Sequence, residues 1–534
     1  MVSTFLCPRG QPRGIPGPHD PSPEYFSGHF HQHLPLRCPV KVAFATPEFQ
    51  SLVRRTNLAE IAEQLPRALM AAGASVRVFL PLTKDIDTSI LSGLKNAGSL
   101  TLPDGDETVR VRVMRGQLNG LELCLIDHAQ LFRTRHPYGD AQGPYSDNWR
   151  RFAIFARAVL EGLELIRFSA DVIHCFDWTT GLIPVIQKLE YQDRVEKHPA
   201  SKAGTFFAVQ NTAMQGSFER EILPKIGIPH SEFHAIGGLE LGGKINYLKA
   251  GAEYATIIGT NSPTMVGTVT SLPNDSTVHD TFRRREKEIV GITPGINYRS
   301  WDPSCDPLLS QAFGPEDKDP TAGKRRCKVS LQKALKLDNG PRTPLICVIG
   351  QFDSDGGFDI VSEALTPLLE RSVQVVMMGP GSPEVLERLH TIEQTFAGRC
   401  RIIEGYNVNT AHVLLGGSDI LLLPSHFHAA PTLPAIGMRY GVVPVTFANG
   451  GLADVVRDVR DHPLDGTGFS FKSYDADSLL EDGIDAARQH YKNTPDWKQV
   501  VVRCLNEDNS WAAAAEEQLK AYRRVRRRTP PRRS

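Results

Sequence analysis

PLICVIGQFDSDGGFDIVSEALTPLLERSVQVVMMG, residues 344–379, determines the fold class of this chain. The stretch opens with the apolar run 344–350 and ends with the apolar run 373–379. A loop rich in Gly and Asp follows the first run, and a helical pattern occupies the region near 358–371. Short apolar runs of this length are typical of strands that are buried on both faces of a parallel sheet. The stretch therefore predicts a strand, a crossover helix and a second parallel strand.

The same alternation extends in both directions along the chain. Towards the C-terminus it predicts a helix near 383–397 and strands at 400–406, 419–425 and 442–447. Towards the N-terminus it predicts strands at 40–46, 75–80, 171–178 and 205–211, with a helix through Leu58 to Leu69 and another at 150–167. Alternating strands and helices predict an α/β protein with two doubly wound, Rossmann-like parallel-sheet domains.

The length of 534 residues and the loops between these patterns suggest where the domains begin and end. Residues 1–39 are rich in Pro, Gly and His without any period, which is typical of a disordered leader. We expect an N-terminal domain at 40–297, a C-terminal domain at 298–509, and a closing helix with an Arg-rich tail at 510–534.

Composition excludes several classes of protein. Lys and Arg total 60 and Asp and Glu total 60, so there is no global field that would favour nucleic acid or membrane surfaces. No apolar run approaches the roughly 20 residues that a membrane helix needs, and the N-terminus lacks the apolar core of a secretory signal. The nine cysteines show no ligand spacing. These features predict a cytoplasmic protein with reduced thiols.

Several motifs lie in a fixed order along the chain: LKAGAEYA (248–255), YRSWDPSCDP (298–307), PSHFHAAPTLPAIGMRYG (424–441), NGGLADVVRD (449–458), GTGFSF (466–471) and SWAAAAEEQLKAYRR (510–524). In this order and spacing they resemble the bacterial glycogen synthases and plant starch synthases over about residues 40–525. The resemblance implies a GT-B fold, in which two domains face a cleft. It also implies retaining transfer of glucose from ADP-glucose to an α-1,4-glucan, with no cofactor.

At four positions the resemblance assigns catalytic residues that this chain does not have. His428 stands at the Glu position, Gln351 at an Arg position, Gly356 at a Lys position and Gln210 at a His position. The Arg and Lys would neutralise the leaving diphosphate, and loss of one such stabiliser commonly lowers the rate by about two to three orders of magnitude. We therefore expect impaired or absent transfer.

Other positions of the family pattern bind substrate, and the resemblance carries that role to this chain. Arg54 replaces a Lys and Glu60 an Asp, while Thr56 and Asn57 replace two glycines that let the backbone approach phosphates. The remaining positions keep residues of the family pattern. They are Asp177, Trp178, Asn211, Gly405, Tyr406, Gly450 and Gly451.

Three functions remain open on the sequence. The first is a degenerate synthase that binds a nucleotide sugar such as ADP-glucose, or an α-glucan, without transferring glucose. The second is an active ADP-glucose-dependent glucosyltransferase with a rewired site. The third is an interaction scaffold. His426 and His428 form an HxH pair, but no third ligand is identifiable in the sequence, so no metal site is predicted.

Overall fold

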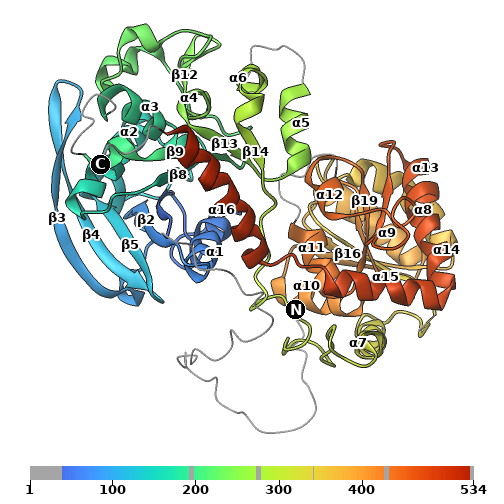
Figure 1. Cartoon of the computed structure of the whole chain (residues 1–534). Coiled ribbons are helices and arrows are strands. Elements are labelled where there is room, and N and C mark those ends of the chain that lie inside the picture. Colours follow the sequence, from blue (N-terminus) through green and yellow to red (C-terminus); the bar gives the residue numbers. More distant parts are fainter. Residues whose placement is uncertain (1–38, 192–197, 272–277, 341, 426–431, 530–534) are drawn as a thin grey trace. The chain divides into compact units, whose positions relative to one another are not determined.

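The computed structural model describes residues 39–191, 198–271, 278–340, 342–425 and 432–529 (Figure 1). Within these residues the chain builds two large β-sheets, each dominated by parallel strands. The predicted α/β class and Rossmann-like organisation are therefore confirmed. His426 and His428 lie outside the described residues, as does the leader apart from Pro39. The domain boundaries stay predictions.

The first sheet has nine strands in the order β14-β13-β9-β8-β1-β2-β5-β4-β3. From β14 to β5 all neighbours are parallel, which matches the predicted crossover pattern. The strands have these bounds: β1 Lys41–Ala45, β2 Ser75–Pro81, β3 Ser92–Asp104, β4 Glu107–Leu118, β5 Leu121–Asp127, β8 Val172–Phe176, β9 Gly204–Val209, β13 Ile257–Thr260 and β14 Ile289–Gly291.

One edge of this sheet differs from the doubly wound prediction, because β3 and β4 form an antiparallel hairpin beside β5. In β4 the buried residues Val109, Val111 and Val113 alternate with exposed arginines. Such alternation is the pattern of an antiparallel strand with one solvated face. The turn Asp104–Glu107 contains Gly105 at φ +65°, a conformation that glycine adopts without strain.

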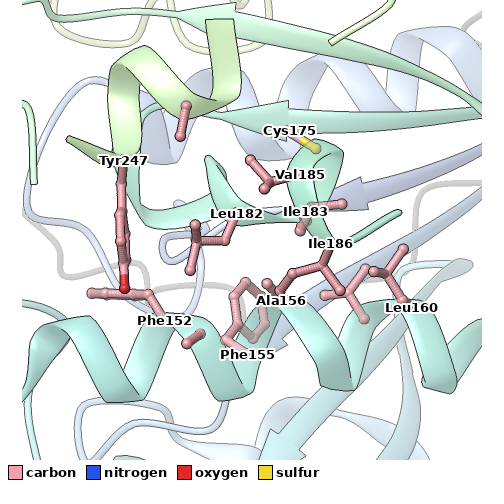
Figure 2. Close-up of a cluster of buried hydrophobic side chains, with 14 of the residues drawn as sticks. Phe152, Phe155, Ala156, Leu160, Cys175, Leu182, Ile183, Val185, Ile186 and Tyr247 are labelled. Carbon is pink, nitrogen blue, oxygen red and sulfur yellow. The ribbon is translucent and has the colours of Figure 1, made fainter. Parts of the chain in front are cut away.

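Alternate residues of each strand face opposite layers of helices, because side chains in a strand alternate between the two faces. Val42 and Phe44 of β1 lie on the face covered by α1 and α16, whereas Ala43 and Ala45 lie on the face covered by α2, α3 and α4. Figure 2 shows the second face, where Phe155 points towards Leu182 and Phe152 lies beside the end of the Tyr247 side chain. The helices on this sheet are α1 Leu58–Ala71, α2 Asn148–Leu165, α3 Leu182–Ile186, α4 Tyr247–Tyr254, α5 Pro263–Ser271, α6 Val278–Arg284 and α16 Trp511–Arg528.

The second sheet has six parallel strands in the order β17-β16-β15-β18-β19-β20. α8 packs against one face and α10 against the other. The strands are β15 Leu345–Ile349, β16 Gln374–Gly379, β17 Cys400–Glu404, β18 Ile420–Leu423, β19 Val443–Phe447 and β20 Phe469–Phe471. The helices are α7 Pro320–Ala334, α8 Phe358–Glu370, α9 Pro383–Thr395, α10 Val408–Gly417, α11 Thr432–Arg439, α12 Gly450–Val455, α13 Ala476–Ser478, α14 Ala486–Lys492 and α15 Thr494–Asn506.

The chain passes between the two sheets twice, and the two passages lie against each other. Ile296 N donates to Asn509 O over 2.8 Å, and Asn509 N donates to Tyr298 Oη over 3.0 Å. A Cβ on Gly295 would lie 2.4 Å from Trp511 N, so this close approach requires glycine. After the second passage, α16 packs its buried residues Ala515, Leu519 and Tyr522 onto the first sheet.

Short strands complete the fold. β10 Ser217–Phe218, β11 Glu240–Leu241 and β12 Lys244–Asn246 form a small sheet, and β6 Gly139–Asp140 pairs with β7 Gly143–Pro144. Among the described residues, no helix has both the length and the apolar character needed to cross a bilayer.

We predict that Gly357→Ala destabilises the protein by about 3 kcal/mol or more, because φ is +78° at this position and the new Cβ would lie 2.4 Å from Pro424 O. Gly73→Ala is the matched control, since φ is +90° there but nothing lies within 4 Å of the added Cβ. It should cost only about 1 kcal/mol. Urea unfolding followed by circular dichroism measures both values. Equal losses in the two variants would contradict the predicted steric contact.

Candidate functional site

The predicted site residues of the first domain lie in loops after three neighbouring parallel strands. Arg54 lies in the loop between β1 and α1, Asp177 directly after β8, and Gln210 directly after β9. Because β9, β8 and β1 are adjacent in the sheet, their carboxyl ends meet at one edge. Ligands of open parallel sheets bind at such an edge, so the fold brings these loops together where a site is expected.

Asp177 has a strained backbone, with φ +52° and ψ −169°. This region of conformational space is almost restricted to glycine, and occupying it costs on the order of 1–3 kcal/mol. The carboxylate holds the turn together, because Asp177 Oδ1 accepts hydrogen bonds from Gln210 N over 2.7 Å and from Asn211 N over 3.3 Å. Asp177 thereby joins the loop after β8 to the loop after β9.

Burial raises the pKa of Asp177 to about 7. The two backbone N–H donors lower this pKa and the nearby negative charge of Glu48 raises it further, but desolvation has the largest effect. A carboxyl group that is both strained and desolvated at the end of a strand is typical of a functional site.

Glu48 also organises this edge, although the sequence analysis did not single it out. Its side chain is fully buried and accepts from Arg55 N over 2.6 Å, from Thr56 N over 2.8 Å and from Thr56 Oγ1 over 2.9 Å. Tyr138 Oη donates to the same carboxylate. Its position in the sequence could have indicated this role, because Glu48 follows the end of the apolar strand by only three residues. A carboxylate buried there needs several hydrogen-bond donors.

The segment from Arg54 to Glu60 leads from this loop into α1. Thr56, at a glycine position of the family pattern, turns its hydroxyl to Glu48 and also accepts from Leu58 N over 3.2 Å. Arg54 is exposed. Burial raises the pKa of Glu60, and the positive charge of Arg54 partly offsets this rise. Arg54 and Glu60 therefore interact electrostatically at the start of α1.

Trp178 lies in the core, with 8% of its surface exposed. Phe152 contacts the ring edge-on at a centroid distance of 4.9 Å, and Phe218 lies at 6.1 Å. A Cβ on Gly216 would lie 2.4 Å from Trp178 Cε3. In this structure the indole supports the turn that carries Asp177. Its predicted role in substrate binding remains untested.

Gln210 and Asn211 follow β9. Gln210 O accepts from Asn261 Nδ2 over 3.3 Å, and Gln210 Oε1 is buried. Asn211 is exposed, and its Oδ1 accepts from Ala213 N over 2.8 Å, which closes a local turn. The substituted His position thus faces the protein interior, whereas the retained Asn lies at the surface.

The second domain has a cavity of about 280 Å³ at the carboxyl ends of β15 and β18. Its polar lining includes Gln351, Asp353, Asp355 and Ser425. No Lys or Arg of the described residues lines this cavity. The loop that the resemblance assigns to diphosphate binding therefore surrounds a cavity with carboxylates in place of cations.

The backbone of this loop excludes a side chain at position 356. A Cβ on Gly356 would lie 2.2 Å from the carbonyl oxygen of Gln351. Gly356 N donates to Asp353 Oδ1 over 2.8 Å, which holds the loop in this tight turn. A Lys at position 356 would therefore require a different backbone in this loop.

The remaining predicted positions lie after β17 and β19. Gly405, at φ +75°, turns the chain between β17 and α10, and Tyr406 beside it is 60% exposed. Gly450, at φ +53°, and the buried Gly451 open α12 after β19. His428 lies outside the described residues, so the structure places every predicted site residue except this one.

A cluster away from these loops has the residue types of a metal site, namely Glu161, Glu164 and His198. His198 Nδ1 accepts from Ala200 N over 3.1 Å, so a neutral ring carries its proton on Nε2. His198 Nε2 lies 3.3 Å from Glu164 Oε2 and 3.7 Å from Glu161 Oε2. A protonated nitrogen cannot ligate a metal, so this arrangement fits a His–carboxylate contact.

Comparison with known proteins gives consistent results along the chain. Residues 41–284 match the model of the starch synthase catalytic domain, and residues 333–497 match that of glycosyl transferases group 1. Glycogen synthase 2 of Geobacter sulfurreducens is 33% identical over 485 residues, which cover 91% of this chain and 98% of the relative. Glycogen synthase of Cellvibrio japonicus is 32% identical over 493 residues, covering 91% and 98%.

Solved structures agree with these matches. The catalytic domain of starch synthase IV from Arabidopsis thaliana, bound to ADP and acarbose, aligns with a TM-score of 0.77 and 26% identity, covering 92% of this chain and 99% of that one. A sucrose-phosphate synthase from Thermosynechococcus elongatus aligns with a TM-score of 0.53 and 15% identity over 91% and 99%. The second similarity shows the fold alone.

We predict that Asp177→Asn stabilises the protein more at pH 8 than at pH 5, by a difference of about 2 kcal/mol. The pKa of Asp177 is raised to about 7 in the folded state, so the folded protein binds more protons than the unfolded one between about pH 4 and pH 7. This contribution to stability falls as the pH rises through that window. Asn imitates the protonated carboxyl group and keeps a side-chain oxygen that accepts from Gln210 N.

Urea unfolding at the two pH values measures this difference. The control is Asp106→Asn, which removes one carboxylate from an exposed turn. A gain in Asp177→Asn that is the same at pH 5 and pH 8 would show that Asp177 is ionised in the folded protein at both pH values.

Proposed function

This chain belongs to the glycogen synthase and starch synthase family of GT-B glycosyltransferases, and we propose that it binds a nucleotide sugar or an α-glucan while transferring glucose slowly or not at all. The observation that carries the proposal is the cavity after β15 and β18, which is lined by Asp353 and Asp355. We further propose that the protein acts in the cytoplasm, in storage-glucan metabolism.

The charge at this cavity opposes the family reaction. Transfer from ADP-glucose leaves a diphosphate on which negative charge develops, and enzymes stabilise such charge with cations and N–H donors. Gln351 supplies no charge, and the backbone at Gly356 leaves no space for a Lys side chain. Two carboxylates in the same lining raise the energy of a bound diphosphate further.

Several retained features support binding. Asp177 keeps a strained and desolvated carboxyl group between the loops after β8 and β9, and Tyr406 keeps an exposed ring after β17. The similar starch synthase IV domain was solved with ADP and acarbose. We propose that the corresponding loops of this chain accept an adenine nucleotide or an α-1,4-linked oligosaccharide.

The deciding experiment measures transfer of labelled glucose from ADP-glucose to glycogen by the purified full chain, with calorimetric binding of ADP-glucose and of acarbose on the same sample. We expect binding of at least one ligand, with turnover lower by about four orders of magnitude or more than that of an intact family member assayed in parallel. Turnover at a comparable rate, abolished in His428→Ala, would instead establish an active transferase with a rewired site. Absence of both binding and turnover would favour the scaffold.

We predict that Asp353→Asn/Asp355→Asn tightens binding of ADP about three- to tenfold, because two negative charges leave the cavity. Asn at 353 keeps an oxygen that accepts from Gly356 N, so the loop conformation is retained. Asp106→Asn/Asp477→Asn is the matched control, with the same change of net charge at two exposed sites. If ADP bound equally more tightly to both double variants, the effect would be one of net charge. The cavity lining would then no longer support the proposed function.

A further inference from the structure

A second, smaller cavity lies where α16 packs on the first sheet. It measures about 30 Å³ and is bordered by α1, by residues at the carboxyl ends of β8, β9 and β13, and by α16. Figure 1 shows α16 running beside α1 at this place. All the lining residues are uncharged side chains or a neutral histidine. The cavity therefore suits a small neutral occupant.

Four buried polar atoms belong to residues that line this cavity, and none has a hydrogen-bond partner within the described part of the chain. His174, Trp511 and Gln518 are each more than nine-tenths buried. Leaving such an atom unsatisfied costs about 1–3 kcal/mol, and nearly all buried polar groups in proteins are paired. The four atoms are His174 Nε2, Gln210 Oε1, Trp511 Nε1 and Gln518 Nε2.

We propose that this cavity is a binding site for about two ordered water molecules, which bridge Gln210 to the C-terminal helix α16. A buried water needs about 10–15 Å³ of such space and two to four polar partners, and both conditions are met here. Trp511 Nε1 donates, Gln210 Oε1 accepts, and the Gln518 amide donates from its nitrogen. These donors and acceptors belong to residues that line the same small cavity.

His174 completes the site in its neutral form. Burial lowers the pKa of His174 to about 3, and its Nδ1 lies 2.7 Å from Tyr522 Oη on α16. If the Tyr522 hydroxyl donates to Nδ1, then Nε2 carries the ring proton and donates to water. If Nδ1 donates to Tyr522, Nε2 accepts from water. Either tautomer presents a polar atom that water satisfies.

The bridge gives Gln210 a role different from that of the His which the family has at this position. Gln210 N donates to the Asp177 carboxylate, while Gln210 Oε1 is a buried atom of a residue that lines the cavity. Gln210 is thus a positioning residue, which connects the strained turn at Asp177 with α16 through water. Because the water site is formed by the cavity and its polar atoms, it is independent of whether the protein transfers glucose.

Gln518→Met and Gln210→Met test the bridge, because Met has nearly the shape of Gln and a similar helix propensity but no amide. With water present, each substitution removes a hydrogen bond and raises the unfolding equilibrium constant about fivefold. The double variant loses less unfolding free energy than the two single variants together, since both amides share the same waters. Gln394→Met, at an exposed position of α9, is the control and should change the constant less than twofold.

A dry cavity would reverse the sign, because removing an unsatisfied amide then stabilises the protein and lowers the unfolding constant in both variants. A crystal structure of the unmodified full chain at high resolution provides an independent readout. Density for water within hydrogen-bond distance of Trp511 Nε1 and Gln210 Oε1 is the expected result. An empty cavity, or side chains rearranged to pair directly with each other, would overturn the proposal.

Discussion

The return of the chain to its first sheet is the constraint on which the rest of this structure depends. The second sheet lies in the sequence between β14 and α16, so its residues enter and leave through two adjacent passages. Ile296 and Asn509 bond these passages together, and Gly295 allows their backbones to touch. Because α16 then buries Leu519 and Tyr522 against the first sheet, the end of the chain is part of the first core.

The fold and the chemistry of this family depend on different residues. The fold can therefore be kept when residues of the chemistry are replaced. The two sheets are stabilised by apolar side chains that alternate between layers of helices, a requirement that many sequences satisfy. Transfer depends on a few charges at the ends of strands. Replacing such charges costs no buried apolar contact, so the α/β architecture is compatible with a cavity lined by Asp353 and Asp355.

Most of the fold was predictable from the sequence because parallel strands and their helices have strong local patterns. The run 344–350 became β15 and the pattern near 358–371 became α8, with shifts of one residue at the ends. The hairpin of β3 and β4 was not predicted, although Val109, Val111 and Val113 alternate with arginines, because its strands are not continuous apolar runs. Local patterning therefore predicted the buried strands better than the half-exposed edge.

The candidate site was less predictable, because side-chain direction depends on tertiary contacts. The resemblance assigns Asp177 and Gln210 to separate segments of the chain, and only the structure shows that a carboxylate oxygen of Asp177 accepts from the backbone N–H of Gln210. The Glu48 carboxylate accepts hydrogen bonds from four donors, and Gln351 O lies close to position 356. These atoms come from different positions along the chain, and no rule of sequence spacing predicts that they meet.

The strain at Asp177 supports the proposal that this edge binds a ligand. A residue with φ +52° and ψ −169° costs stability, and burial that raises its pKa to about 7 adds a second cost. Glycine would remove the first cost and an amide the second, while the neighbouring strands β8 and β9 would keep their pairing. The same carboxyl group joins the loops after β8 and β9 through Gln210 N and Asn211 N, so its two costs accompany a structural role at the sheet edge where ligands of open parallel sheets bind.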